Sequence, residues 1–543
     1  MSRGRELLLA AFGAAALTVA LTYPLARHPA TLGRTDNFDG QFSVWNVAWV
    51  ARTLVVDPFR VFDANIFYPH RNTLAYSETN LGAGALAIPF YWATRNPYVA
   101  LNGALLLSFV LSAIGTYFLV RHLVHDRAAA TVSAITFAFC PYALAHTPHI
   151  QLMMTAGLPF GMLAFHRVAD LPTPGRGAAL GAVMAAGALA CGYYAVFVAL
   201  MVGFATLVVA ASRGQWTNSR YWLSIGIAAV VSIVLVAPVV WPYLQLQRNA
   251  GFHRSLEAAG SYSAVWSSYL ASSSYAHAWM LPLIGRWNDV LFPGFVAVIF
   301  GAIGAAAGWR ARGSTRELVI LYGGLGALAL WASFGPAAGL YRVLYRTVPM
   351  FTLMRAPARF GLVVMFALSV IAAVGVAWTM RKAGNKAAIA IGLAAAAALE
   401  LWVPAPWRPV EPIDPGYRRL ASLPSGPVLE LPVYSDLFAF MRSRYMLAST
   451  AHWMPLIDAY SDYMPADFVE QADVLGEFPT LDSFKALERI GARYAIFHVD
   501  LYPADAAARL RDRLRQFAGC LQLEYGDERM LVYEIVRFEC KAP

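Results

Sequence analysis

Two carboxylates, Asp36 and Asp39, lie in a short segment that follows the first long apolar run of the chain, residues 6–26. A chain that leaves a membrane after such a run places the next residues at or just outside the membrane surface. A carboxylate there can take the proton of a hydroxyl group, as a general base does in a group-transfer reaction, and nearby lipid raises its pKa by desolvation. We therefore expect a short loop that presents Asp36 and Asp39 beside the bilayer, where the head group of a lipid-linked substrate would lie. The alternative is that Asp39 and Gly40 form a turn that caps the next helix.

Two tryptophans follow these carboxylates at helical spacing. Trp45 and Trp49 are four residues apart, with Val44 and Val47 beside them, so they share one face of a helix. The pattern predicts an amphipathic helix lying in the membrane interface. Such a helix would hold the acidic loop beside the bilayer, and Trp45 is a candidate for contact with a lipid-linked substrate.

Two arginines, Arg355 and Arg359, flank Pro357 in an Arg-x-Pro-x-Arg pattern. The proline disfavours a regular helix, so the pattern predicts a loop at the external mouth of a membrane span. Two guanidinium groups there can hold a phosphate through paired hydrogen bonds. The alternative is that both side chains extend to lipid head groups.

A second polar group lies around Pro148, where His146, His149 and Gln151 meet at a predicted helix junction. Imidazoles can assist a base, bind a metal or hydrogen-bond sugar hydroxyls, but they are also common as satisfied interfacial residues. The proline separates the two histidines, and the spacing fixes no third metal ligand. Glu78 is either a second functional carboxylate of the first loop or the N-terminal acid of the helix after it.

The segment 245–289 is rich in aromatic residues. Their faces can stack on sugar rings, although a belt of aromatics at the membrane interface is the commoner explanation. The residues are Tyr262, Trp266, Tyr269, Tyr275, Trp279 and Trp287. We keep Trp287 as a candidate sugar-binding residue.

Composition identifies a membrane protein. Hydrophobic residues make up 58% of the 543 residues and charged residues 14%, and the mean hydropathy is +0.51. Soluble domains hold about 45–50% apolar residues. The net charge of +10 does not indicate nucleic-acid binding, because much of the arginine lies in short gaps between apolar runs, where the positive-inside rule explains it.

The arginine-rich gaps also predict the topology. They give an all-α polytopic protein with about eleven spans, a cytoplasmic N-terminus and an external C-terminus. The apolar segment 81–93 is short and contains Pro89, so we expect it to be re-entrant or interfacial. The expected external loops are 27–96, 245–289 and 335–359, all within a transmembrane domain 1–403. The expected spans are 6–26, 98–120, 128–145, 150–165, two within 178–211, 221–243, 290–309, 318–334, 360–380 and 387–403.

A proline-rich linker after residue 403 precedes a more polar segment, 404–543. Two apolar runs, 428–433 and 494–499, have the character of strands, and 504–517 that of a charged helix. These features predict an external α+β domain. Cys520 and Cys540 bracket an expected hairpin, so we expect them to form a disulfide in an oxidising compartment.

An aspartate-bearing first external loop, a re-entrant segment, about eleven spans and an external C-terminal domain together resemble the GT-C class of membrane glycosyltransferases. The chain also resembles the YfhO-like bacterial group of that superfamily in three stretches. They are the first loop from Asp36 to Trp49, the sequence Phe67-Tyr68-Pro69, and the sequence Arg355-Ala356-Pro357-Ala358-Arg359-Phe360. The resemblance implies an enzyme of the bacterial inner membrane that transfers a sugar, with inversion, from a polyprenyl-phosphate donor to a glycan, lipid or protein outside the cytoplasm. It implies a first-loop aspartate as base. The spacing Asp-x-x-Asp departs from the adjacent acidic pairs of several such families, so a divalent metal at Asp36 and Asp39 stays open.

Two other classes of function stay open at this stage. A transporter or lipid flippase would carry charged residues within its spans and repeated halves, whereas these spans hold almost no charge and show no convincing repeat. A non-catalytic cell-envelope assembly protein would keep the fold without the activity. Substitution of the two aspartates distinguishes it from an enzyme.

Overall fold

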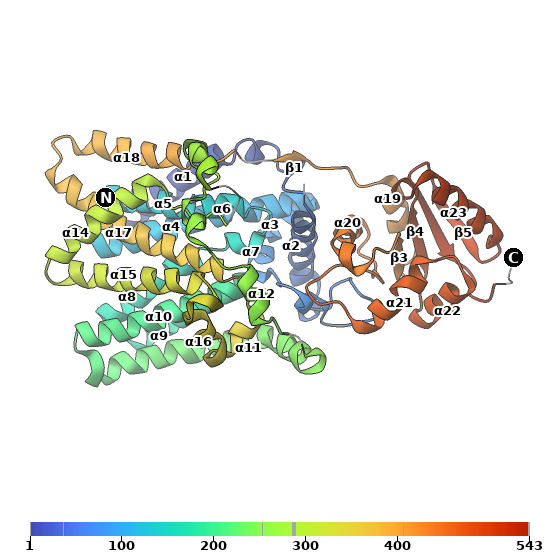
Figure 1. Cartoon of the computed structure of the whole chain (residues 1–543), viewed down its shortest axis with the longest axis horizontal. Helices are drawn as coiled ribbons and strands as arrows, with labels where there is room; N and C mark the ends of the chain where they lie inside the picture. The colour runs from blue at the N-terminus through green and yellow to red at the C-terminus, as the bar shows by residue number, and fades with distance from the viewer. Residues whose placement is uncertain (1, 36, 252, 285–288, 405–406, 541–543) are drawn as a thin grey trace. The chain divides into compact units, whose positions relative to one another are not determined.

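A computed structural model describes residues 2–35, 37–251, 253–284, 289–404 and 407–540 (Figure 1). The described chain forms two compact units. The first contains Met1–His28, Asn80–Ala83 and Asn102–Trp407, and the second contains Pro29–Thr79, Gly84–Leu101 and Arg408–Pro543. Asp36 and Trp287, both candidate site residues, lie outside the described residues.

The first unit is a bundle of apolar helices. A helix, or a pair of short helices, occupies every segment that hydropathy and charge predict to span the membrane. The long helices are α1 (Arg3–Leu21), α4 (Pro97–Val124), α5 (Arg127–Ala138), α8 (Gly157–Asp170), α9 (Pro174–Ala190), α10 (Gly192–Ser212), α11 (Ser219–Ala250), α14 (Phe295–Arg310), α15 (Ser314–Ser333), α17 (Gly361–Lys382) and α18 (Lys386–Glu400).

In the described part of the chain, six helices are long and apolar enough to cross a membrane, judged by length and composition. They are the helices over Arg3–Leu21, Pro97–Val124, Arg127–Ala145, Gly192–Ser212, Ser219–Ala250 and Pro357–Lys382. The helix α3 (Leu81–Thr94), with Pro89 inside it, is one of the shorter apolar helices, as is α14. A multi-pass membrane protein is thus confirmed, and the count of eleven spans stays a prediction.

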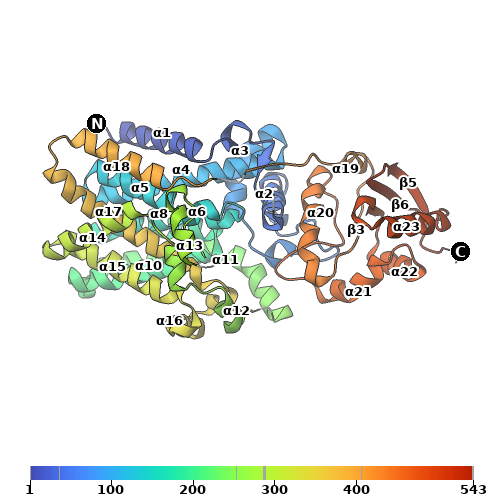
Figure 2. The same ribbon diagram turned by 45° about the horizontal axis from the view of Figure 1, so that its top comes forward.

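Helix α17 forms the centre of the bundle, packed against α5, α14 and α15 (Figure 2). Small residues make the closest of these contacts. A Cβ atom on Gly304 of α14 would collide with the backbone of Ile371, and one on Gly375 of α17 would collide with the backbone of Phe300. Close backbone approach of this kind is how helices gain packing contacts where lipid offers no hydrophobic driving force.

Breaks in the helices bring polar residues to one end of α10 and α17. The apolar stretch 178–211 breaks at Cys191, one residue before the predicted position, and α10 starts at Gly192. Two short helices, α6 (Pro141–Ala145) and α7 (Ile150–Met153), precede α8. A single 3-10 turn, η9 (Pro357–Phe360), precedes α17 and bears out the prediction that Pro357 prevents a regular helix.

The second unit contains a four-stranded sheet in the order β3, β4, β6, β5. Strand β3 (Val428–Leu431) runs parallel to β4 (Tyr494–His498). Strand β6 (Met530–Ile535) runs antiparallel to both β4 and β5 (Leu521–Gly526). The helices α19 (Pro415–Ala421), α21 (Ala466–Gly476), α22 (Leu481–Ile490) and α23 (Ala504–Gln516) complete the α+β arrangement. Cys520 and Cys540 form a disulfide across the base of the β5–β6 hairpin.

The same unit includes the first loop of the chain. Strand β1 (Leu32–Gly33) pairs antiparallel with β2 (Arg408–Pro409), and α2 (Phe38–Val56) packs on α20 (Ser443–Ala448). The Asn65 amide donates to Ser449 Oγ and to the Met454 carbonyl, both at 3.1 Å. Buried polar groups of the loop are therefore satisfied by residues of the C-terminal segment, which joins the two into one folded body.

Candidate functional site

Asp39 is exposed in the first turn of α2. Asn37 caps this helix, because its Oδ1 accepts the Gly40 N–H at 2.8 Å. The alternative in which Asp39 itself caps the helix is thus wrong. Gly40 has no room for a side chain, since a Cβ there would collide with the Arg34 carbonyl, so the backbone on either side of Asp39 is closely fixed.

The tryptophans of α2 are not on a surface. Trp45 is 0% exposed and its Nε1–H donates to Asn65 Oδ1 at 3.0 Å. Trp49 donates to the Val61 carbonyl at 2.9 Å. The expectation that this face meets the membrane is therefore wrong, because residues of the loop and of the C-terminal segment cover it. Trp45 is a core residue of the second unit, and its indole N–H is already bonded.

Glu78 lies in the same unit as Asp39, in the irregular segment before α3. Its backbone carbonyl accepts a hydrogen bond from the Asn46 amide at 3.1 Å, which ties this segment to α2. Asp39 and Glu78 therefore both belong to the second unit and not to the helical bundle.

Arg355 and Arg359 belong to the first unit and share one organising residue, Tyr193, in the first turn of α10. The Arg355 N–H donates to the Tyr193 hydroxyl at 2.9 Å. The guanidinium of Arg359 lies over the Tyr193 ring, with 4.2 Å from Cζ to the ring centroid. The Arg355 guanidinium lies 5.4 Å from the ring centroid of Tyr262. The structure thus brings the predicted arginine pair together around two aromatic rings.

His146 and His149 lie in the same unit, at the junction between α6 and α7. Their ring centroids are 6.1 Å apart, and His146 Nδ1 lies 2.8 Å from the Tyr142 carbonyl. Burial lowers the pKa of His146 to about 3, and the nearby charges of His149 and Arg359 act in the same direction. His146 is therefore neutral at neutral pH and belongs to the electrostatic surroundings of Arg359. Gln151 follows, half-buried, in the first turn of α7.

Among the residues with described positions, no cluster of three or more His, Cys, Asp or Glu side chains could hold a metal ion. Of the expected metal pair Asp36 and Asp39, Asp36 lies outside the described residues. Within the described part of the aromatic segment 245–289, the Tyr262 ring lies next to the Arg355 guanidinium, and the Tyr262 carbonyl accepts the Ala358 N–H at 3.1 Å.

Sequence reasoning did not assign a role to Tyr193. The signal was present, because Gly192-Tyr193-Tyr194 marked the point where a long apolar run divides into two helices. A break of this kind leaves the first turn of the second helix at the end of a span, where a polar aromatic side chain can reach a neighbouring loop.

No family model matches the chain, and no curated protein matches it. Among solved structures it is similar to the arabinofuranosyltransferase AftD from Mycobacteria, with 13% identity and a TM-score of 0.59. The match covers 98% of this chain and 40% of AftD, so the chain spans less than half of that protein. A mutant of AftD gives 14% identity, 98% and 42% coverage and a TM-score of 0.58.

The chain also aligns with ArnT from Cupriavidus metallidurans, with 14% identity over 98% of this chain and 100% of ArnT, but the TM-score of 0.41 is too low to support a conclusion. The AftD match establishes the fold. The resemblance to GT-C membrane glycosyltransferases expected from the sequence thus agrees with this match at the level of the fold alone.

Proposed function

We propose that this chain is an integral-membrane glycosyltransferase. It transfers a sugar from a polyprenyl-phosphate donor to a glycan, lipid or protein acceptor outside the cytoplasm, with inversion at the anomeric carbon. The observation that carries the proposal is the similarity to AftD, because 98% of the chain takes part in a fold whose solved example is named for transfer of a sugar.

The arginine pair supports a phosphate site. When the bond between the sugar and the phosphate breaks, its electron pair stays with the phosphate, which gains negative charge. Among the described residues, no carboxylate forms an ion pair with Arg359, and its guanidinium is held by the Tyr193 ring. A cation stacked in this way keeps its N–H groups available for phosphate oxygens and needs no rearrangement as charge develops.

Asp39 is the proposed base. Its carboxylate takes the proton of the acceptor hydroxyl while that oxygen forms the new bond to the anomeric carbon, and the phosphate leaves from the opposite side. Its exposure and its fixed backbone suit this role. Asp36 is the alternative base, and a divalent ion shared by the two aspartates stays open. His149, His146, Gln151 and Glu78 are proposed as further substrate-binding residues.

The proposed topology places the N-terminus in the cytoplasm of a bacterial cell and residues 404–543 outside the inner membrane, with eleven spans between them. Reporter fusions after Arg213 and at the C-terminus should then report opposite sides of the membrane. The same side for both fusions would contradict the proposed number of spans.

The direct test uses the purified full-length chain in lipid nanodiscs with a panel of synthetic polyprenyl-phosphate sugars, including an arabinofuranosyl donor. We expect release of polyprenyl phosphate that depends on an added acceptor, measured by mass spectrometry together with the glycosylated acceptor. Donors that bind but are never consumed by any acceptor of the three classes would contradict the enzyme and favour an assembly protein.

A further inference from the structure

A cavity of about 960 Å³ lies in the helical unit, at the end where α4 and α8 finish and where α1 and α9 begin. This volume is within the range of protein sites for small molecules and lipids. Its polar lining includes four arginines and two carboxylates, together with His122 and His125. The arginines are Arg3, Arg121, Arg167 and Arg176, and the carboxylates are Glu6 and Asp170.

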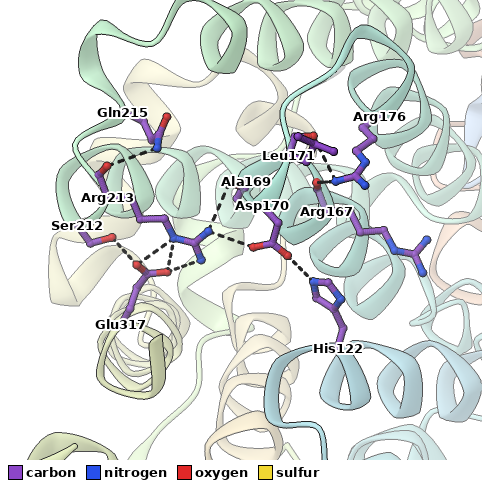
Figure 3. A network of polar contacts seen from close by, with 10 residues as sticks. All are labelled: His122, Arg167, Ala169, Asp170, Leu171, Arg176, Ser212, Arg213, Gln215 and Glu317. Carbon is purple, nitrogen blue, oxygen red and sulfur yellow. Dashed lines mark hydrogen bonds and ion pairs between the residues drawn. The ribbon is translucent and has the colours of Figure 1, made fainter. Parts of the chain in front are cut away.

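Both carboxylates already have cationic partners. Glu6 accepts from Arg121 Nε at 2.7 Å and lies 3.4 Å from Arg127 Nε. Asp170 contacts His122 at 2.8 Å and Arg213 at 3.1 Å, and Arg213 also pairs with Glu317 at 2.7 Å (Figure 3). Both carboxylates of the cavity are therefore already paired. Among the described residues, no carboxylate balances the positive charge of the other three arginines, Arg3, Arg167 and Arg176.

Arg167 is the clearest of these. Its side chain is exposed and lines the cavity, and in the described part of the chain no carboxylate pairs with it. Figure 3 shows its guanidinium without a contact, while its backbone carbonyl accepts from Arg176 Nη1 at 2.6 Å. Arg3 at the start of α1 is also exposed and has no carboxylate partner among the described residues. The cavity thus presents unpaired positive charge.

The rest of the lining is apolar. Phe118 of α4, Phe160 and Leu163 of α8, and Val183 of α9 form this part of the wall. Helices α1 and α4 are among the candidate membrane spans, so the cavity lies where spans end, at the level of lipid head groups. A small inorganic anion would use the arginines alone. An amphiphile with a charged head and an acyl chain would use both parts of the lining.

We propose that this cavity binds an anionic glycerophospholipid. Arg167 and Arg3 contact the phosphate of the head group, and an acyl chain lies against Phe118 and Phe160. Basic pockets between spans at the cytoplasmic side are a recurrent form of lipid recognition. The 21 residues of α10 separate this end from Tyr193 by about 30 Å, so the cavity is distinct from the arginine pair. The proposal does not depend on the glycosyltransferase activity.

The test compares lipids bound to the full-length protein by native mass spectrometry. Dioleoyl phosphatidylglycerol is the probe and dioleoyl phosphatidylcholine the neutral comparison. We expect clear preference for phosphatidylglycerol, and Arg167→Gln should reduce that preference by about fivefold, the typical effect of one basic residue near a lipid surface. Arg3→Gln is a second variant at the same cavity. Arg220→Gln is the matched control, because Arg220 is exposed near the start of α11 and does not line the cavity.

Four results would overturn the proposal. Equal retention of both lipids would mean that the arginines make no use of head-group charge. Displacement of phosphatidylglycerol by millimolar inorganic phosphate would identify a site for free anions. Retention of undecaprenyl phosphate in place of phosphatidylglycerol would identify a second site for a polyprenyl lipid. If Arg167→Gln and Arg3→Gln both behave like Arg220→Gln, the lipid binds elsewhere.

Discussion

The Tyr193 hydroxyl accepts a hydrogen bond of 2.9 Å from the backbone N–H of Arg355, across 162 positions of the sequence. The ring of the same tyrosine lies under the guanidinium of Arg359. One side chain therefore fixes the backbone at one arginine and the charged group of the other. This arrangement explains how a loop interrupted by Pro357 can hold two cations in a defined position.

Arg359→Ala should weaken donor binding and slow transfer together, with a loss in kcat of about 10²–10³-fold. The reason is that the guanidinium holds the phosphate in the ground state and stabilises the extra charge as it leaves. Steady-state kinetics with a polyprenyl-phosphate sugar measure both effects. Arg346→Ala is the control, since Arg346 is exposed on α16 (Leu340–Thr347). If Arg359→Ala and Arg346→Ala have equal activity, Arg359 does not hold the phosphate.

Tyr193→Phe refines the same measurement. It keeps the ring under Arg359 and loses only the bond to the Arg355 N–H, so we expect a smaller loss than in Arg359→Ala. Tyr193→Leu removes both interactions and should approach the Arg359→Ala result.

Asp39→Asn should lower turnover by about 10²–10⁴-fold with little change in donor binding, because the amide keeps the size of the side chain but cannot accept the proton. Asp57→Asn is the matched control, at the other end of α2. Asp36→Asn separates the two possible bases, and an equal response of both variants to divalent ions would indicate a metal site. Wild-type turnover in both Asp36→Asn and Asp39→Asn would exclude the first loop as the active site.

The sequence predicted the elements more reliably than the contacts between them. Hydropathy located the helices because each apolar run is a local property. The β5–β6 hairpin was located for the same reason, because Gly526-Asp527 is a local turn signal between two strand-like runs. The partners of α2 could not be predicted, since Asn65 and Ser449 are 384 positions apart and no local pattern records that they meet. Trp45 and Trp49 show the consequence. Their spacing defines one apolar face correctly, but it does not reveal whether lipid or protein covers it.

The Cys520–Cys540 disulfide should protect both cysteines from thiol-reactive labels in the mature protein. Denatured, unreduced protein should then take up label at Cys140 and Cys191 alone, which are buried in the folded protein and form no disulfide, and reduction should expose the other pair. Mass spectrometry of labelled peptides measures this. Loss of the disulfide in Cys520→Ser should destabilise the unit by about 2–5 kcal/mol. Label on Cys520 and Cys540 without reductant would contradict the bonded form.

A buried acidic pair in the second unit predicts that its stability depends on pH. Glu430 and Asp458 are both 0% exposed, and burial raises the pKa of Glu430 to about 8 and that of Asp458 to about 7. Two buried histidines of the same unit, His498 and His452, are shifted the other way, since burial lowers the pKa of each to about 3. His498 Nε2 lies 2.8 Å from Glu430 Oε2 and Tyr417 donates to the same oxygen at 3.1 Å.

Whether stability rises or falls with pH depends on which state, folded or unfolded, binds more protons. Folding raises the pKa of the Glu430 carboxyl from 4.5 to about 8. The carboxyl therefore contributes fully to the stability of the folded state below pH 4.5, and this contribution is lost as the pH rises to about 8. The two histidines act oppositely, and their contribution is lost as the pH falls below 6.5. Between pH 4.5 and 6.5 the effects oppose each other, so the clear prediction is a fall in stability from pH 6.5 to 8.

Glu430→Gln should remove much of this fall, because the amide stays neutral at every pH and can still bond to His498 and Tyr417. The difference in free energy of unfolding between the variant and the wild type should change by on the order of 2 kcal/mol between pH 6.5 and 8. Thermal unfolding of the detergent-solubilised full chain, followed by intrinsic fluorescence, measures it. Glu528→Gln is the control, since Glu528 is exposed in the turn between β5 and β6. Parallel pH profiles for the wild type and Glu430→Gln would mean that Glu430 is ionised in the folded protein.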